Sequence, residues 1–166
     1  LLQIDFLLEF FALAKAKGIH TTLDTSGNPF TREGERFEKI RKLLKVTDLV
    51  MLDIKHIDDE QHKILTGQTN RNILDMARYL DEIGKPMWIR HVLVPERSDK
   101  DEYLTRLDAF IQSLHNVQKV EVLPYHTLGA YKWKELGYEY PLEGIDPPTQ
   151  ERIKNANLLL HTGARV

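Results

Sequence analysis

Residues 49–55 read LVMLDIK, an apolar run that ends abruptly in an aspartate, an isoleucine and a lysine. A short apolar run bounded by polar residues is typical of a strand in a parallel sheet that helices cover. Three further segments have the same character, at residues 19–24, 87–94 and 117–123. The sequence therefore predicts four strands.

Helical periodicity fills the segments around these strands. Apolar residues recur every three or four positions in residues 1–17, 33–44, 72–84 and 103–114, and a last helix is expected at residues 149–160. The third of the crossover helices has a candidate N-cap in Asp99, with Glu102 three residues later. Strand and helix thus alternate along the chain, which predicts an α/β fold of four parallel strands alternating with helices.

Four strands are too few to close an eight-stranded barrel. The chain is either a small open sheet or part of a larger barrel whose other strands lie on another stretch of sequence. It begins at Leu1 rather than at Met, and no capping residue precedes its first helix. These features favour the second alternative, and we expect residues 1–166 to form a single incomplete domain.

The overall composition argues against several classes of protein. The 166 residues carry 23 Lys and Arg against 25 Asp and Glu, so the chain lacks the basic surface that binds nucleic acid. We find no export signal or membrane-spanning run and expect a cytoplasmic protein. The chain has no cysteine, so these residues supply neither disulfides nor thiolate ligands for zinc or iron–sulfur centres.

Polar residues stand near the carboxyl ends of all four predicted strands. In parallel α/β folds these ends meet at one edge of the sheet, where ligands bind. Strand alternation also places Met51, Asp53 and Lys55 on one face of the second strand. The candidates, in chain order, are Asp24 and Thr25, then Asp53 and Lys55, then Arg90 and His91, and finally Tyr125 and His126.

Each main candidate also has a plain structural reading. Asp24 precedes Thr-Ser-Gly and is able to cap that loop; His126 suits an ordinary turn. Arg90 lies inside an apolar run, so its guanidinium needs either an ion pair with Asp24 or Asp53 or the carboxylate of a ligand. The remaining histidines show no metal-ligand spacing and are expected at the surface: His20, His56, His62, His115 and His161.

Four strings at the strand ends carry a family resemblance. They are LDTSG at residues 23–27, VTDLVMLDIK at 46–55, WIRHVLVP at 88–95 and VEVLPYHTLGAYKW at 120–133. In this order they resemble the pyruvate formate-lyase activating enzymes, which are members of the radical S-adenosylmethionine family. The resemblance runs over nearly the whole chain.

The resemblance implies a radical-SAM partial (β/α)6 barrel whose strand ends bind S-adenosylmethionine beside a [4Fe-4S] cluster. The family's cofactor-contacting Asp and Lys match Asp53 and Lys55, with a main-chain contact from Ile54 between them. Its histidine near the cofactor ribose matches His126, and two further pocket residues match Asp24 and Arg90. The guanidinium of Arg90 and the ammonium of Lys55 suit the methionine carboxylate.

The resemblance also implies partners. Enzymes of this kind generate a radical on a backbone glycine of pyruvate formate-lyase, or of a related glycyl-radical enzyme, in anaerobic glucose metabolism, and a flavodoxin-type donor supplies the electrons. Their cluster-binding Cys-x-x-x-Cys-x-x-Cys loop and Gly-Gly-Glu segment are absent here, and we expect both upstream of Leu1. The 166 residues alone are then expected to be inactive, and to self-associate through the first strand edge and the exposed Phe6 and Phe10.

Two other classes of function stay open at this stage. Asp24, Asp53 and His126 are residue types that hold Mg²⁺ or Zn²⁺, so a metal-dependent hydrolase or lyase is one alternative. The other is a non-catalytic interaction module that uses the long loop at residues 127–148, which is rich in Gly, Pro and Tyr.

Overall fold

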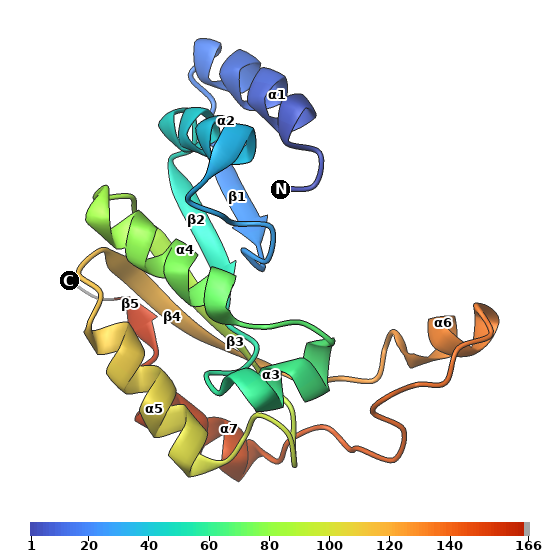
Figure 1. Ribbon diagram of the computed structural model, residues 1–166. Coiled ribbons are helices and arrows are strands. Elements are labelled where there is room, and N and C mark those ends of the chain that lie inside the picture. The colour runs from blue at the N-terminus through green and yellow to red at the C-terminus, as the bar shows by residue number, and fades with distance from the viewer. Residues whose placement is uncertain (165–166) are drawn as a thin grey trace.

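A computed structural model describes residues 1–164 of the chain as a curved sheet flanked by helices (Figure 1). The five strands are β1 (Thr22–Thr25), β2 (Leu49–Asp53), β3 (Met87–Leu93), β4 (Val117–Pro124) and β5 (Gly163–Ala164). The helices are α1 (Ile4–Ala16), α2 (Gly34–Lys45), α3 (Asp59–Thr66), α4 (Arg71–Glu82), α5 (Asp101–Gln112), α6 (Ala130–Glu135) and α7 (Gln150–Leu159).

The sheet has the order β1-β2-β3-β4-β5, and the first four strands are parallel. The predicted set of four parallel strands with crossover helices is therefore confirmed. The prediction missed β5, which pairs antiparallel with β4 over two residues. So short a strand has too few residues for an apolar pattern to reveal it.

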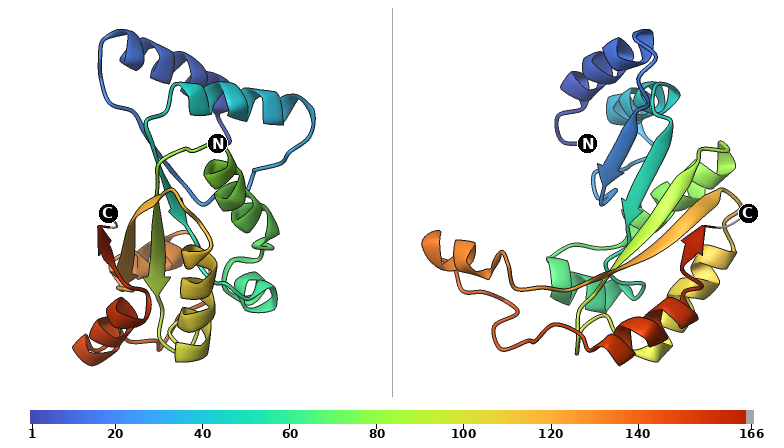
Figure 2. Two further views of the ribbon diagram at one scale, coloured as in Figure 1. Left: turned by 90° about the vertical axis from the view of Figure 1, so that its left-hand side faces the viewer. Right: turned by 180° about the vertical axis from the view of Figure 1, so that it is seen from behind.

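Apart from α3 and α6, the helices lie along one side of the sheet, and the hydrophobic core lies between the two layers (Figure 2). Strand β3 shows how alternation divides the faces. Met87, Ile89 and Leu93 are wholly buried toward the helices, whereas Arg90 and Trp88 are half-buried on the opposite face. The face of the sheet that carries Arg90 and Trp88 thus stays partly open.

Two short helices were not predicted. Helix α3 begins where the Asp58 side chain accepts a hydrogen bond from the Gln61 amide at 3.2 Å, and it ends at Gly67, whose φ of +74° is left-handed. Those two residues are ordinary start and stop signals. Helix α6 lies in the segment expected to be loop, and it has no side-chain cap.

The predicted N-cap of helix α5 is wrong. Lys100 precedes the helix, and no side chain caps it. Asp99 instead pairs with Arg152 of α7 at 3.6 Å, and the guanidinium also reaches Asp101 at 2.9 Å. The two carboxylates therefore tie the start of α5 to α7.

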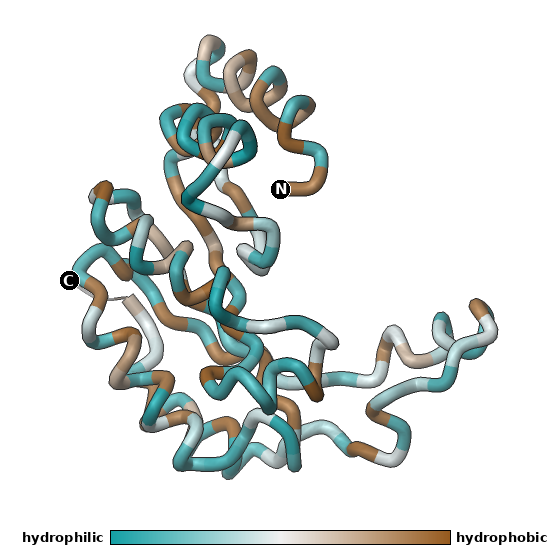
Figure 3. The backbone as a smooth tube through the Cα atoms, in the orientation of Figure 1, coloured by the Kyte–Doolittle hydropathy of each residue, from teal (hydrophilic) through white to brown (hydrophobic). Residues whose placement is uncertain are grey.

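Residues 126–149, which we call the arm, extend away from the sheet and carry α6 (Figures 1 and 2). The hydropathy tube in Figure 3 shows brown apolar segments in the strands and along α1, and mixed colours along the arm. Among residues 1–164, no helix combines the length and the apolar character needed to cross a membrane.

Candidate functional site

Four charged side chains from three neighbouring strands meet near the carboxyl ends of β1, β2 and β3. Arg90 Nε donates to Asp53 Oδ1 at 2.8 Å, and its Nη2 pairs with both Asp53, at 2.7 Å, and Asp24. Lys55 Nζ donates to the second oxygen of Asp53 at 2.7 Å. We call Asp24, Asp53, Lys55 and Arg90 the charged cluster. It holds two carboxylates and two cations.

The register of the sheet brings these residues together. Asp53 pairs with Arg90 across the β2–β3 ladder, and Asp24 lies opposite Met51 in the β1–β2 ladder. Met51 and Asp53 are two residues apart, so both point to the open face, as strand alternation predicted. The sequence prediction that these strand ends converge is confirmed for the charged cluster.

Exposure differs sharply within the charged cluster. The side chains of Asp53 and Arg90 are only 15% and 16% exposed, whereas that of Asp24 is 55% exposed. Partial burial works against the charge of Arg90, but the Asp53 and Asp24 carboxylates outweigh it and raise the pKa of the guanidinium. Arg90 is thus a fixed cation on a partly open surface. Within residues 1–164 the hydrogen bonds of this guanidinium come from Nε and Nη2, and none comes from Nη1.

The alternative in which Asp24 caps the following loop is wrong. The Thr25 hydroxyl performs that task, because it accepts a hydrogen bond from the Gly27 amide at 3.0 Å. Gly27 has a φ of +71°, and a Cβ at this position would lie 2.9 Å from the Leu52 side chain, so a larger residue would require Leu52 to move. The Asp24 carboxylate is therefore directed to Arg90.

Ile54 and His126 lie differently from the charged cluster. The Ile54 side chain is wholly buried, its amide donates to the Arg90 carbonyl at 2.9 Å, and its carbonyl faces His91 Nδ1 at 2.9 Å. A main-chain contact from Ile54 to a ligand would have to use the second lone pair of that carbonyl. His126 is exposed and has no hydrogen bond or ion pair to the charged cluster within the described part of the chain.

The metal-site alternative is contradicted by this geometry. No three His, Asp or Glu side chains among residues 1–164 lie close enough together to hold an ion. The carboxylates of Asp24 and Asp53 both face Arg90, and His126 does not join them.

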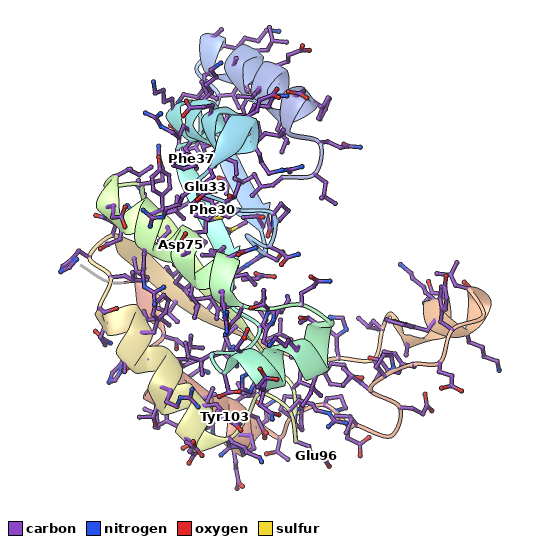
Figure 4. The ribbon with its side chains drawn as sticks, in the orientation of Figure 1. Phe30, Glu33, Phe37, Asp75, Glu96 and Tyr103 are labelled. Atoms are coloured by element: carbon purple, nitrogen blue, oxygen red, sulfur yellow. The ribbon has the colours of Figure 1, made fainter. Side chains whose placement is uncertain are left out.

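The expectation that the remaining histidines lie at the surface is wrong for two of them. His56 and His62 are 1% and 2% exposed, and the Nε2 atom of each has no partner in the described chain. His56 packs edge-on against Tyr103 of α5, labelled in Figure 4, with ring centroids 4.4 Å apart. Burial is the main cause that lowers the pKa of His56. Both histidines come after Lys55 in the chain, and the sequence around them has no pattern that predicts burial.

The arm carries a small aromatic cluster. Trp133 contacts Tyr138 and Tyr140, with ring centroids 6.4 Å and 5.8 Å apart, and the Tyr140 hydroxyl lies 2.6 Å from that of Tyr125. A cavity of 360 Å³ lies between the arm and the end of α3, and Arg97 is among its lining residues. Partner binding by this arm stays a prediction.

Comparison with known proteins places the chain in a family. The sequence model of the radical SAM superfamily matches residues 1–107. The pyruvate formate-lyase-activating enzyme of Streptococcus mutans serotype c is 58% identical over 161 residues, which are 97% of this chain and 61% of that relative. The enzyme of the same name from Listeria monocytogenes serovar 1/2a is 54% identical over 164 residues, 99% of this chain and 66% of the relative.

A solved structure shares the fold of this chain. A crystal structure of a domain of pyruvate-formate lyase-activating enzyme from Bacteroides vulgatus ATCC 8482 superposes with a TM-score of 0.76 and 20% identity, over 96% of this chain and 86% of that one. That likeness shows a shared fold and confirms the predicted α/β class. The chain spans 61% to 66% of the length of the two curated relatives. From the match over residues 1–107, the chain belongs to the radical SAM superfamily.

Proposed function

We propose that this chain forms the S-adenosylmethionine-binding part of a pyruvate formate-lyase-activating enzyme. The observation that carries the proposal is the 58% identity with the Streptococcus mutans enzyme over 97% of the chain. The charged cluster supports it independently, because it places two cations and two carboxylates at the edge where parallel α/β folds bind ligands.

The donor set of the charged cluster fits S-adenosylmethionine. The methionine part of the ligand has a carboxylate, which the Nη1 of Arg90 and the 32% exposed Lys55 ammonium are suited to bind. Its ammonium and ribose hydroxyls are donors, and the exposed Asp24 carboxylate is an acceptor. In the proposed complex, His126 lies beside the ribose. When bound, the cofactor supplies the radical chemistry of the family, and the residues of this chain hold and orient it.

An iron–sulfur cluster does not fit the residues present. Such clusters are held by cysteine thiolates, and the 166 residues contain no cysteine. We propose that these residues bind the cofactor but do not catalyse the reaction by themselves. In the whole protein the partner would be pyruvate formate-lyase or a related glycyl-radical enzyme, and the electron donor would be of the flavodoxin type.

Calorimetric titration of the chain with S-adenosylmethionine tests the proposal. We expect saturable binding with one site, and adenosine should bind at least about tenfold more weakly because it lacks the groups that reach Arg90 and Lys55. Lys55→Ala should weaken binding by a similar factor. Heat of dilution alone, with no saturation at millimolar ligand, would refute the proposal.

The chain offers a matched control for Lys55→Ala. Lys39 pairs with Asp5 at 2.9 Å and with Glu35 at 3.0 Å, and it is 30% exposed, close to the 2.7 Å pair and 32% exposure of Lys55. Lys39→Ala therefore removes a similarly exposed ammonium and its ion pairs outside the charged cluster, and it should leave the dissociation constant unchanged.

A further inference from the structure

The imidazole ring of His91 lies on the core face of β3. It is 2% exposed, and the core positions two residues to either side of it on this strand, Ile89 and Leu93, are wholly buried and apolar. Burying an imidazole among such residues is costly unless its nitrogens find partners. An imidazole at this position therefore points to a role that an aliphatic side chain could not perform.

The His91 ring joins two segments that lie beyond the strand ends. Its Nδ1 lies 2.9 Å from the Ile54 carbonyl, and its Nε2 lies 3.3 Å from the Ser98 carbonyl. Ser98 belongs to the loop between β3 and α5, which Glu96 marks in Figure 4. The ring thus contacts the residue between Asp53 and Lys55 from the side opposite to the charged cluster.

Ile54 is held at both of its main-chain groups by β3. Regular β2–β3 pairing ends at Asp53 and Arg90, and the next amide, that of Ile54, donates to the Arg90 carbonyl at 2.9 Å. The Ile54 carbonyl then receives the ring of His91. Because Asp53 and Lys55 flank Ile54 directly, a shift of this peptide would move both of their side chains.

The ring has a single proton to give to these two carbonyl oxygens. Both carbonyls only accept, and a neutral imidazole has one N–H. Burial lowers the pKa of His91, and the Lys55 ammonium acts in the same direction, so the ring is neutral at pH 7. The shorter contact is the one at Nδ1, and we therefore assign the proton to Nδ1, where it is donated to Ile54.

We propose that His91 is a positioning residue that holds the Asp53–Lys55 segment in its ligand-binding conformation through the Ile54 carbonyl. The inference rests on the proposed function, since S-adenosylmethionine is the ligand whose site His91 would fix. His91 itself does not touch the open face, because Arg90 and His91 are consecutive in the strand and point to opposite sides.

Two substitutions distinguish the effect of the His91 N–H donor from the effect of the ring's volume. His91→Phe keeps a ring of similar volume and removes the N–H, which leaves the Ile54 carbonyl unpartnered. His91→Asn keeps a donor on a shorter side chain. By calorimetry we expect His91→Phe to weaken S-adenosylmethionine binding about tenfold, as for one lost hydrogen bond, and His91→Asn to recover most of that loss.

Ile89→Ala provides the control for general destabilisation. It removes a buried side chain from the same face of the same strand and is expected to lower the melting temperature while the dissociation constant stays the same. Hydrogen exchange of the peptide covering residues 53–56 provides a second readout that needs no ligand. His91→Phe should speed exchange there, and Ile89→Ala should not do so selectively.

The outcomes distinguish this inference from the proposed function. If the unsubstituted chain does not bind S-adenosylmethionine, the proposed function fails, and exchange at residues 53–56 still decides whether His91 holds the segment. The positioning role is overturned if His91→Phe leaves both binding and exchange unchanged. It is also overturned if Ile89→Ala weakens binding as much as His91→Phe does.

Discussion

Asp53 and Arg90 occupy paired positions on neighbouring parallel strands, and the Arg90 guanidinium lies 2.8 Å from the Asp53 carboxylate through Nε. Both side chains are about one-sixth exposed, so their interaction is screened less than a surface pair. Arg90 also reaches Asp24, which joins β3 to β1 across β2. The same guanidinium therefore serves the stability of the sheet and the charge of the candidate site.

Removal of Arg90 should destabilise the fold. In Arg90→Leu the Asp53 carboxylate keeps only Lys55, and we expect the free energy of unfolding to fall by about 1–3 kcal/mol in urea denaturation. The control is Arg41→Leu, which breaks a half-exposed pair with Glu38 within α2. That change should cost less than about 1 kcal/mol. Equal stabilities of the two variants would contradict a structural role for the charged cluster.

Alanine substitutions at Gly27 and Gly84 separate two costs in stability, that of a left-handed backbone and that of a steric clash. Both have positive φ, +71° and +65°, but a Cβ on Gly27 would lie 2.9 Å from Leu52 whereas one on Gly84 would meet nothing within 4 Å. Gly84→Ala should cost about 1–2 kcal/mol from the left-handed conformation alone. Gly27→Ala should cost a further 1–3 kcal/mol or so from overpacking. Thermal unfolding of both variants measures the difference, and equal losses would mean that Leu52 yields without cost.

The charged cluster could be predicted from sequence because it depends on a general property of parallel sheets. All strands end at the same edge, and alternation fixes which side chains share a face, so Asp24, Asp53 and Arg90 could be placed together before any coordinates. The family resemblance then assigned them to a cofactor. Lys55 joined them because it lies two residues beyond Asp53.

The histidines could not be predicted in this way. Burial of His56 depends on the position of Tyr103. Alternation places His91 on the face opposite to Arg90, but its contact with Ser98 depends on a loop that the strand pattern does not position. Both partners come from segments whose packing is set by the whole fold. Strand β5 and helix α6 were missed for a related reason, since two residues and six residues carry too little periodicity to predict an element.

Mild acid should destabilise the chain through the buried histidines. Burial lowers the pKa of both His56 and His91, while Asp58 favours the charged form of His56 and Lys55 opposes that of His91. Because the unfolded chain takes up these protons near pH 6.5 and the folded chain does not, stability should be full above pH 7 and fall as the pH drops below about 6.5. Melting temperatures between pH 8 and 5 measure the effect.

The acid sensitivity has its own control. His20 is exposed, and His20→Gln should leave the pH profile of the melting temperature unchanged. A His56→Gln, His91→Asn double variant should instead give a flatter profile between pH 7 and 5. If the profile of the double variant keeps the slope of the unsubstituted chain, groups other than these two histidines carry the effect.

Helix α1 leaves an apolar face uncovered in the described chain, and this face should drive self-association. Phe6 and Phe10 are 60% and 53% exposed, and their rings stack with centroids 5.7 Å apart. Strand β1 lies at one end of the sheet order, so it adds an edge whose backbone groups are free to pair. We expect the mass measured by light scattering to rise with protein concentration, because apolar surface is removed from water when two such faces meet.

A Phe6→Ser, Phe10→Ser double variant should stay monomeric. Leu158→Ser, which removes a single exposed side chain from α7, should associate like the unsubstituted chain. A monomeric mass at every concentration would contradict this role of α1, and association that persists in the double variant would place the contact at the β1 edge instead.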